Sequence, residues 1–138
     1  MAENRVIIDT GPLVAFLVKD ETHHQRVVEQ FQWLPAPFLT CEAVLTETFF
    51  LVRQLPHGTS KFFALITSGL LDIDFSIIAE GAVLEKLVQR YANVPMSLAD
   101  ACLVRLAKLH PQTVVFTLDH DFQIYRLDGR QPIPLLIP

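Results

Sequence analysis

The fold is decided by the stretch Val6-Ile7-Ile8-Asp9-Thr10-Gly11-Pro12, in which an apolar run stops at an acid and a turn follows. A short run of β-branched residues is typical of a strand that is buried on both faces, as in a parallel sheet. Asp9 then stands at the carboxyl end of that strand, and Pro12 favours the first turn of a helix directly behind it. The opening of the chain therefore predicts a buried strand followed at once by a helix.

The rest of the chain repeats this alternation of short apolar runs and helical stretches, which is typical of strand–helix–strand units around a parallel sheet. We predict strands at residues 5–8, 38–40, 71–74, 114–116 and 133–136. We predict helices at residues 12–17, 23–33, 43–55, 60–68, 78–91 and 98–109, and a short one at 120–125. The expected fold class is α/β, with a central parallel sheet of about five strands.

Length and composition indicate one domain over residues 1–138. The 138 residues are 51% hydrophobic, enough for a core that buries roughly two-thirds of the unfolded surface. A net charge of −4 and a pI near 5.6 exclude a generally basic surface. Any contact with nucleic acid must therefore rely on a local group of basic side chains and on bound metal. The start of the chain lacks a signal-peptide pattern and no apolar run could span a bilayer, so we expect a cytoplasmic protein without membrane contact. Cys41 and Cys102 stand outside any paired-cysteine motif and are expected to be buried packing residues.

Four acids stand where the apolar pattern predicts a buried side chain: Asp9, Glu47, Asp100 and Asp119. Asp9 and Asp119 each follow a predicted strand. Glu47 and Asp100 lie in predicted helices, three or four positions from apolar residues, so each shares a helix face with those residues. Both helical acids are therefore expected to point inward. Because an isolated carboxylate loses several kcal/mol on leaving water, repeated inward acids need a common counter-charge. A divalent cation such as Mg²⁺ or Mn²⁺, which prefers oxygen ligands, is the simplest one.

Taken singly, three of the acids also fit a capping role. Asp9 stands where an N-cap of the following helix is expected, and either Asp119 or Asp121 could cap the short helix near residue 120. Asp100 follows Ser97 at the spacing of a capping box. The joint pattern favours a metal site, because ligands of open α/β sheets bind at the carboxyl ends of the strands, where helices also begin.

Glu47 has no capping explanation, since it lies one turn inside its helix. Its alternative is a buried ion pair with Arg53 or Arg105. Both interpretations of Glu47 stay open on the sequence alone.

The chain resembles the PIN-domain nucleases, in particular the VapC-type ribonuclease toxins and related stand-alone bacterial PIN proteins, over essentially its whole length. The resemblance is carried by four stretches that contain the four acids, at residues 6–13, 46–51, 96–101 and 116–122. It implies a single PIN-like domain with a three-layer α/β/α fold. It also implies RNA cleavage that depends on Mg²⁺ or Mn²⁺ and proceeds by a metal-activated water.

Residue by residue, the resemblance implies catalytic and metal-binding roles for Asp9, Glu47, Asp100 and Asp119. The resemblance also implies that Thr10, Thr117 and the more variable acid Asp121 would contact these four acids and orient them without binding metal themselves. The implied partners are an RNA substrate and a cognate antitoxin protein.

Two pairs of adjacent aromatic residues, Phe49-Phe50 and Phe62-Phe63, cannot both face fully inward on their helices. One member of each pair is expected to be exposed, in a homodimer interface or in an apolar groove for an antitoxin helix.

Three other functions are compatible with single features of this sequence. Asp9-Thr10-Gly11 occurs in aspartic proteases, but that fold is all-β and the helical periodicity of this chain speaks against it. A phosphoaspartyl-transfer enzyme also begins with a strand that ends in Asp, but Gly11 stands where its second Asp is expected. A catalytically silent PIN-type module that binds RNA or protein would be indicated by a missing acid, and all four acids are present.

Overall fold

The strand predicted at the start of the chain forms the centre of a five-stranded parallel sheet. The computed structural model describes residues 5–138. Its main sheet contains β1 (Arg5–Ile8), β2 (Phe38–Leu39), β3 (Leu71–Asp72), β4 (Thr113–Phe116) and β7 (Leu135–Leu136), in the order β3-β2-β1-β4-β7. All neighbouring strands of this sheet are parallel, which confirms the predicted sheet.

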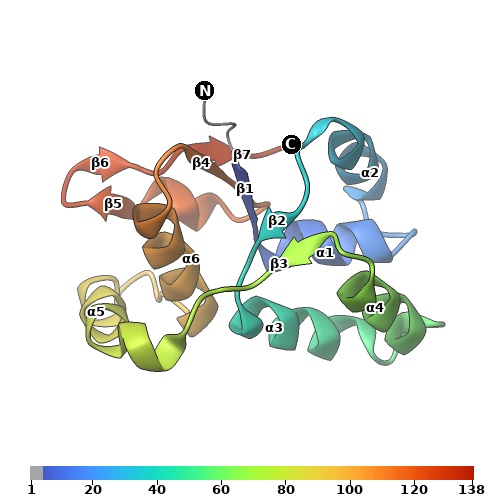
Figure 1. Cartoon of the computed structure of the whole chain (residues 1–138), viewed down its shortest axis with the longest axis horizontal. Coiled ribbons are helices and arrows are strands. Elements are labelled where there is room, and N and C mark those ends of the chain that lie inside the picture. The colour runs from blue at the N-terminus through green and yellow to red at the C-terminus, as the bar shows by residue number, and fades with distance from the viewer. Residues whose placement is uncertain (1–4) are drawn as a thin grey trace.

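Helices cover both faces of the sheet, so the predicted three-layer α/β/α arrangement is confirmed (Figure 1). The helices are α1 (Thr10–Leu17), α2 (His24–Trp33), α3 (Glu42–Val52), α4 (Gly58–Thr67), α5 (Ile77–Arg90) and α6 (Leu98–Leu109). On one face, Phe31 of α2 packs its ring 4.9 Å from that of Phe38 and 6.1 Å from that of Phe116. On the other face, α6 contacts β1 and β4, and α5 packs against α6. None of the helices within residues 5–138 is both long enough and apolar enough to cross a membrane.

The burial of β1 follows from its central position. Val6, Ile7 and Ile8 are each at most 1% exposed, because β2 and β4 flank the strand and helices cover both of its faces. A strand buried on both sides has no solvent face, so its sequence is a continuous apolar run without alternation. This is the physical basis of the first prediction.

The strand order reverses beside β1, and this positions the functional site. From β1 the chain builds outward through β2 to β3, and it then returns to the opposite side of β1 as β4. The carboxyl ends of β1 and β4 therefore lie at the switch point of the sheet, where a crevice for ligands forms in open α/β folds. The backbone N–H of Asp9 donates to the carbonyl of Phe116 at 3.0 Å, which continues the pairing of the two strands up to this crevice.

A small antiparallel hairpin was not predicted. It pairs β5 (Arg126–Asp128) with β6 (Gln131–Pro132) after the short 3₁₀ helix η1 (His120–Gln123), and it stands apart from the main sheet. Its strands carry charged and polar residues, so they lack the alternating apolar pattern by which a half-buried strand is recognised.

Candidate active site

A pocket of about 450 Å³ opens at the carboxyl ends of β1 and β4. The residues that line it are Asp9, Thr10, Gly11, Glu47, Pro95, Ser97, Asp100, Leu118, Asp119 and Asp121. All four acids singled out in the sequence lie in this lining, together with Asp121. The chain thus brings five carboxyl groups from four separate segments into one pocket.

Asp9 is the most deeply placed of these acids, with 6% of its surface exposed. Its Oδ1 accepts a hydrogen bond from the backbone N–H of Thr10 at 2.7 Å, and its Oδ2 accepts one from the hydroxyl of Thr117 at 2.7 Å. Burial raises the pKa of Asp9 to about 6, the two hydrogen bonds oppose this, and the nearby Asp100 and Asp119 add to it. The acid therefore caps α1, as one interpretation held, and also faces the pocket.

Asp100 lies in the first turn of α6, where Ser97 caps the helix by accepting the backbone N–H of Asp100 at 3.0 Å. Its Oδ2 accepts a hydrogen bond from the hydroxyl of Tyr125 at 2.7 Å. Burial raises the pKa of Asp100, and the charge of Asp119 raises it further, whereas the hydrogen bonds from Tyr125 and Ser97 lower it. Like Asp9, Asp100 therefore belongs both to a helix-capping motif and to the lining of the pocket.

Glu47 reaches the pocket, but the reason given from the sequence was wrong. Glu47 is exposed, and so are Phe50 and Leu51, because the buried face of α3 runs instead through Val44, Thr48 and Val52. The side chain extends along the surface, and its Oε2 accepts a hydrogen bond from the hydroxyl of Thr10 at 3.0 Å.

The alternative of an ion pair for Glu47 is also wrong. Arg105 pairs with Glu80, with an Nε–Oε2 distance of 2.7 Å. The guanidinium of Arg53 lies over the ring of Phe50, 4.1 Å from its centroid.

Asp119 and Asp121 are positioned by the turn that follows β4. The backbone N–H of Asp119 donates to the hydroxyl of Thr117 at 2.9 Å, and Oδ1 of Asp119 accepts the backbone N–H of Asp121 at 2.9 Å. Thr117 is fully buried and does not line the pocket, so it connects Asp9 and Asp119 from behind.

The donor chemistry of the pocket fits a hard divalent cation. Within the part of the chain that the structure describes, five carboxyl groups line the pocket, and no Lys, Arg or His side chain does. Within residues 5–138, no three His, Cys, Asp or Glu side chains are arranged closely enough to enclose an ion as they stand. Carboxylates repel one another and here bond to neutral hydroxyl and N–H donors, so an ion would draw them together, with waters to complete its coordination.

Tyr125 is the one contact of these acids that sequence reasoning missed. A signal was available, since Tyr125 follows Phe122, the last residue of the closing motif, at a helical spacing of three, and the structure buries both side chains fully. An apolar position occupied by tyrosine implies a buried hydroxyl that must find a partner.

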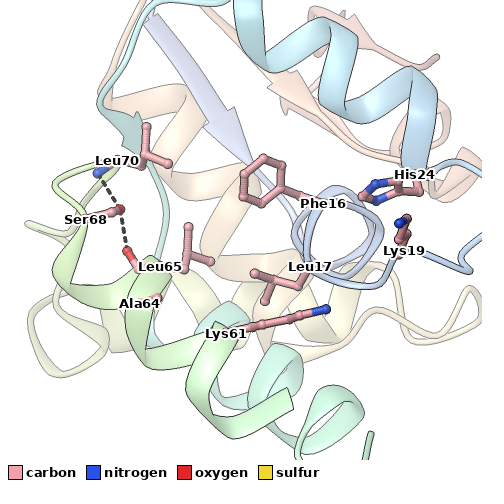
Figure 2. A pocket seen from close by; sticks show the side chains of 9 residues that line it. All are labelled: Phe16, Leu17, Lys19, His24, Lys61, Ala64, Leu65, Ser68 and Leu70. Carbon is pink, nitrogen blue, oxygen red and sulfur yellow. Dashed lines mark hydrogen bonds between the residues drawn. The ribbon is translucent and has the colours of Figure 1, made fainter. Parts of the chain in front are cut away.

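A second hollow, of about 470 Å³, lies between α1, α2 and α4 (Figure 2). It is lined by Phe16, Leu17, Lys19, His24, Lys61, Ala64, Leu65, Ser68 and Leu70. The side chains of Phe16, Leu17 and Leu65 face the hollow, and Lys19 and Lys61 lie at its edge. No acid belongs to this lining, so its chemistry is the opposite of that of the acidic pocket.

Comparisons with known proteins agree with this fold and these motifs. The family model of the PIN domain matches residues 6–128, which include all the acids of the pocket. Among solved structures, the chain is similar to VapC20 of Mycobacterium tuberculosis, described as a sarcin-ricin loop cleaving toxin, at 22% sequence identity and a TM-score of 0.70. The similarity covers 86% of this chain and 93% of that one. A comparison with curated proteins gives no match. Because the family model spans β1 to the hairpin and contains every acid of the pocket, this chain belongs to the PIN domain family.

Proposed function

We propose that this protein is a metal-dependent endoribonuclease that hydrolyses phosphodiester bonds in RNA. The observation that carries the proposal is the gathering of Asp9, Glu47, Asp100, Asp119 and Asp121 in one pocket without a basic residue among its lining. Such a pocket repels a phosphate unless a cation stands between them. Membership of the PIN domain family supports this reaction class.

Asp9, Glu47, Asp100 and Asp119 would hold Mg²⁺ or Mn²⁺, which would polarise the phosphate and make a water molecule more acidic. The chain's own residues prepare the acids for this role. Thr117 and the N–H of Thr10 fix both oxygens of Asp9, and the hydroxyl of Thr10 holds Glu47. Asp119 is tied to the backbone of the turn after β4 and would complete this metal site or position the attacking water.

The bond that breaks, and with it the two products, is the one that the resemblance to PIN-domain nucleases implies. The oxygen of water forms a bond to phosphorus, and the bond from phosphorus to the 3′ oxygen breaks. One product then carries a 5′-phosphate and the other a 3′-hydroxyl. A nuclease that used the ribose 2′-hydroxyl as nucleophile would leave a cyclic phosphate instead.

The test is RNA cleavage by the purified protein with Mn²⁺, and again with EDTA. VapC20 is described as cleaving the sarcin-ricin loop, so a stem-loop of that sequence is a first substrate, beside a panel of structured and single-stranded RNAs. We expect cleavage only with metal, and we expect the downstream fragment to be ligated by an enzyme that requires a 5′-phosphate. Cyclic-phosphate ends, or cleavage that survives EDTA, would contradict the proposal. RNA binding without cleavage would favour the silent binding module.

A toxin role would add an antitoxin partner, and the hollow between α1, α2 and α4 supports one. Its apolar floor and its lysines, Lys19 and Lys61, complement an amphipathic segment with acidic residues beside its apolar face (Figure 2). The partner to test is the protein encoded next to this one, if its gene encodes a small DNA-binding protein. Lys19→Glu with Lys61→Glu should weaken that complex, whereas unchanged binding would exclude this surface.

The same proposal includes a homodimer. α3, α4 and the turn between them expose apolar side chains, namely Phe50 (64%), Leu51, Leu55, Phe63 (52%) and Ile66. Phe63 also packs against the core, since its ring lies 5.2 Å from that of the buried Phe62 and 6.0 Å from that of the partly buried Phe49. Exposed apolar side chains that group on neighbouring helices are typical of a protein–protein interface.

A further inference from the structure

Tyr125 reaches the acids of the pocket from the protein side. Its hydroxyl donates a hydrogen bond of 2.7 Å to Oδ2 of Asp100, although the tyrosine has no exposed surface and does not line the pocket. A buried phenol oxygen needs a hydrogen-bonding partner, and here that partner is an acid of the candidate active site.

The ring of Tyr125 is fixed by aromatic neighbours. The rings of Phe122 and Tyr91 each lie 5.1 Å from it, at interplanar angles of 84° and 67°. The hydroxyl of Tyr91 is itself engaged, because it accepts the backbone N–H of Arg126 at 3.0 Å. Edge-to-face packing of this kind leaves a buried ring little freedom, so the direction of the Tyr125 hydroxyl is set by the core.

The bond from Tyr125 belongs to a pattern in the pocket, in which three acids each accept a side-chain hydroxyl from a threonine or a tyrosine. The pairs are Thr117 with Asp9, Thr10 with Glu47, and Tyr125 with Asp100. A hydroxyl is neutral, so it restrains a carboxylate without supplying the positive charge that the acids need. That charge remains to be supplied by an ion.

We propose that Tyr125 is a positioning residue that holds the carboxylate of Asp100 in its metal-binding orientation. The inference rests on the proposed function, because it takes Asp100 to be a metal ligand. Without the hydroxyl, the carboxylate gains rotational freedom that it must lose again when an ion binds. The loss of a hydrogen-bonding partner behind a ligand typically lowers metal affinity by about 10- to 100-fold.

The experiment compares Tyr125→Phe with Tyr91→Phe. Each variant removes one phenol oxygen from the same aromatic cluster and keeps the ring, but the hydroxyl of Tyr91 contacts a backbone N–H and that of Tyr125 contacts Asp100. Binding of Mn²⁺ to the full chain is measured by calorimetry without RNA, and thermal melts without metal show whether each variant is folded. We expect Tyr125→Phe to weaken Mn²⁺ binding about tenfold or more and Tyr91→Phe to leave it within about twofold.

A double-mutant cycle separates positioning from a general effect on the fold. In an Asp100→Asn background the carboxylate is absent, so Tyr125→Phe should weaken Mn²⁺ binding no further. An equal loss in that background, wild-type affinity in Tyr125→Phe alone, or an equal loss in Tyr91→Phe would each overturn the inference. Wild-type protein that binds Mn²⁺ no more tightly than Asp9→Asn would overturn the proposed metal site itself, and the role of Tyr125 with it.

Discussion

Asp9 is the most buried acid of the pocket, and this gives the metal-free protein a defined response to pH. Its carboxyl group is almost fully buried, and burial is the largest cause of the rise of its pKa from 3.8 to about 6. Between these two values the folded protein keeps a proton that the unfolded chain has lost. The free energy of unfolding therefore falls as pH rises through this range, and the rise in pKa corresponds to roughly 3 kcal/mol once both states are ionised.

Asp9→Asn should therefore stabilise the metal-free protein at pH 7 and lose this advantage as pH falls toward 4. Asparagine carries no charge at either pH, so the variant avoids the cost of the buried carboxylate. Thermal melts in EDTA between pH 4 and pH 7 measure the effect, and Asp20→Asn, at an exposed acid outside the pocket, is the matched control. An equal change in melting temperature at both ends of this range would show that the charge of Asp9 is not the cause.

The residues that the sequence could not place correctly are those whose side chains reach beyond their own helix face. The positions of Asp9 and Asp119 in the pocket can be predicted because both acids follow a strand, and that of Asp100 because it lies on an apolar helix face. Glu47 was assigned to the pocket although its face of α3 is exposed, because the length of the side chain and its bond to Thr10 decide where the carboxylate lies. The contact of Tyr125 with Asp100 joins residues 25 positions apart, which no local pattern reveals.

At the scale of the elements, the turn between α3 and α4 depends on one glycine. A Cβ atom at Gly58 would lie 1.7 Å from the carbonyl oxygen of Val52, which is backbone and cannot turn aside. Residue 58 begins α4, two residues before the start at residue 60 that the sequence predicts for this helix. The structural reason for the glycine is therefore close approach between two segments of backbone.

Gly58→Ala is expected to destabilise the protein by roughly 3 kcal/mol or more, at the upper end of the range for overpacking. Gly81 in α5 is the matched control, since a Cβ atom there would meet nothing within 4 Å. Gly81→Ala should stabilise the protein by about 0.5–1 kcal/mol through helix propensity. Urea unfolding of both variants provides the measurement. A Gly58→Ala variant as stable as wild type would mean that the turn relaxes in a way the structure does not show.

Elements of the main sheet and the large helices were predictable, whereas the hairpin was not. Strand β1 and helix α6 carry continuous or periodic apolar patterns because they are buried in the core. The hairpin strands β5 and β6 are two to three residues long, and their form is fixed by a turn at Asp128-Gly129, with Gly129 at a φ of 60°. Short polar strands leave little periodicity to recognise.

For the whole molecule, the exposed apolar side chains on α3 and α4 lead us to expect a homodimer. Light scattering at micromolar concentration should give twice the chain mass of 15.6 kDa. Phe50→Asp with Phe63→Asp should give the monomer, because both side chains are more than half exposed and add little to the core of one chain. Ile78→Asp, at a 95% exposed residue of α5, is the control. A monomeric mass for the wild-type protein would contradict the homodimer, and the exposed apolar side chains would then bind another partner or none.

The reaction at the acidic pocket is measured as RNA cleavage by wild type, Asp9→Asn and Asp20→Asn, each with Mn²⁺ and with EDTA. Removal of one ligand charge should lower the rate of Asp9→Asn by orders of magnitude while its melting curve shows a folded protein. Asp20→Asn should cleave as wild type does, and EDTA should stop both. Equal cleavage by wild type and Asp9→Asn, or cleavage that persists in EDTA, would contradict the claim that these acids form a metal-dependent nuclease site.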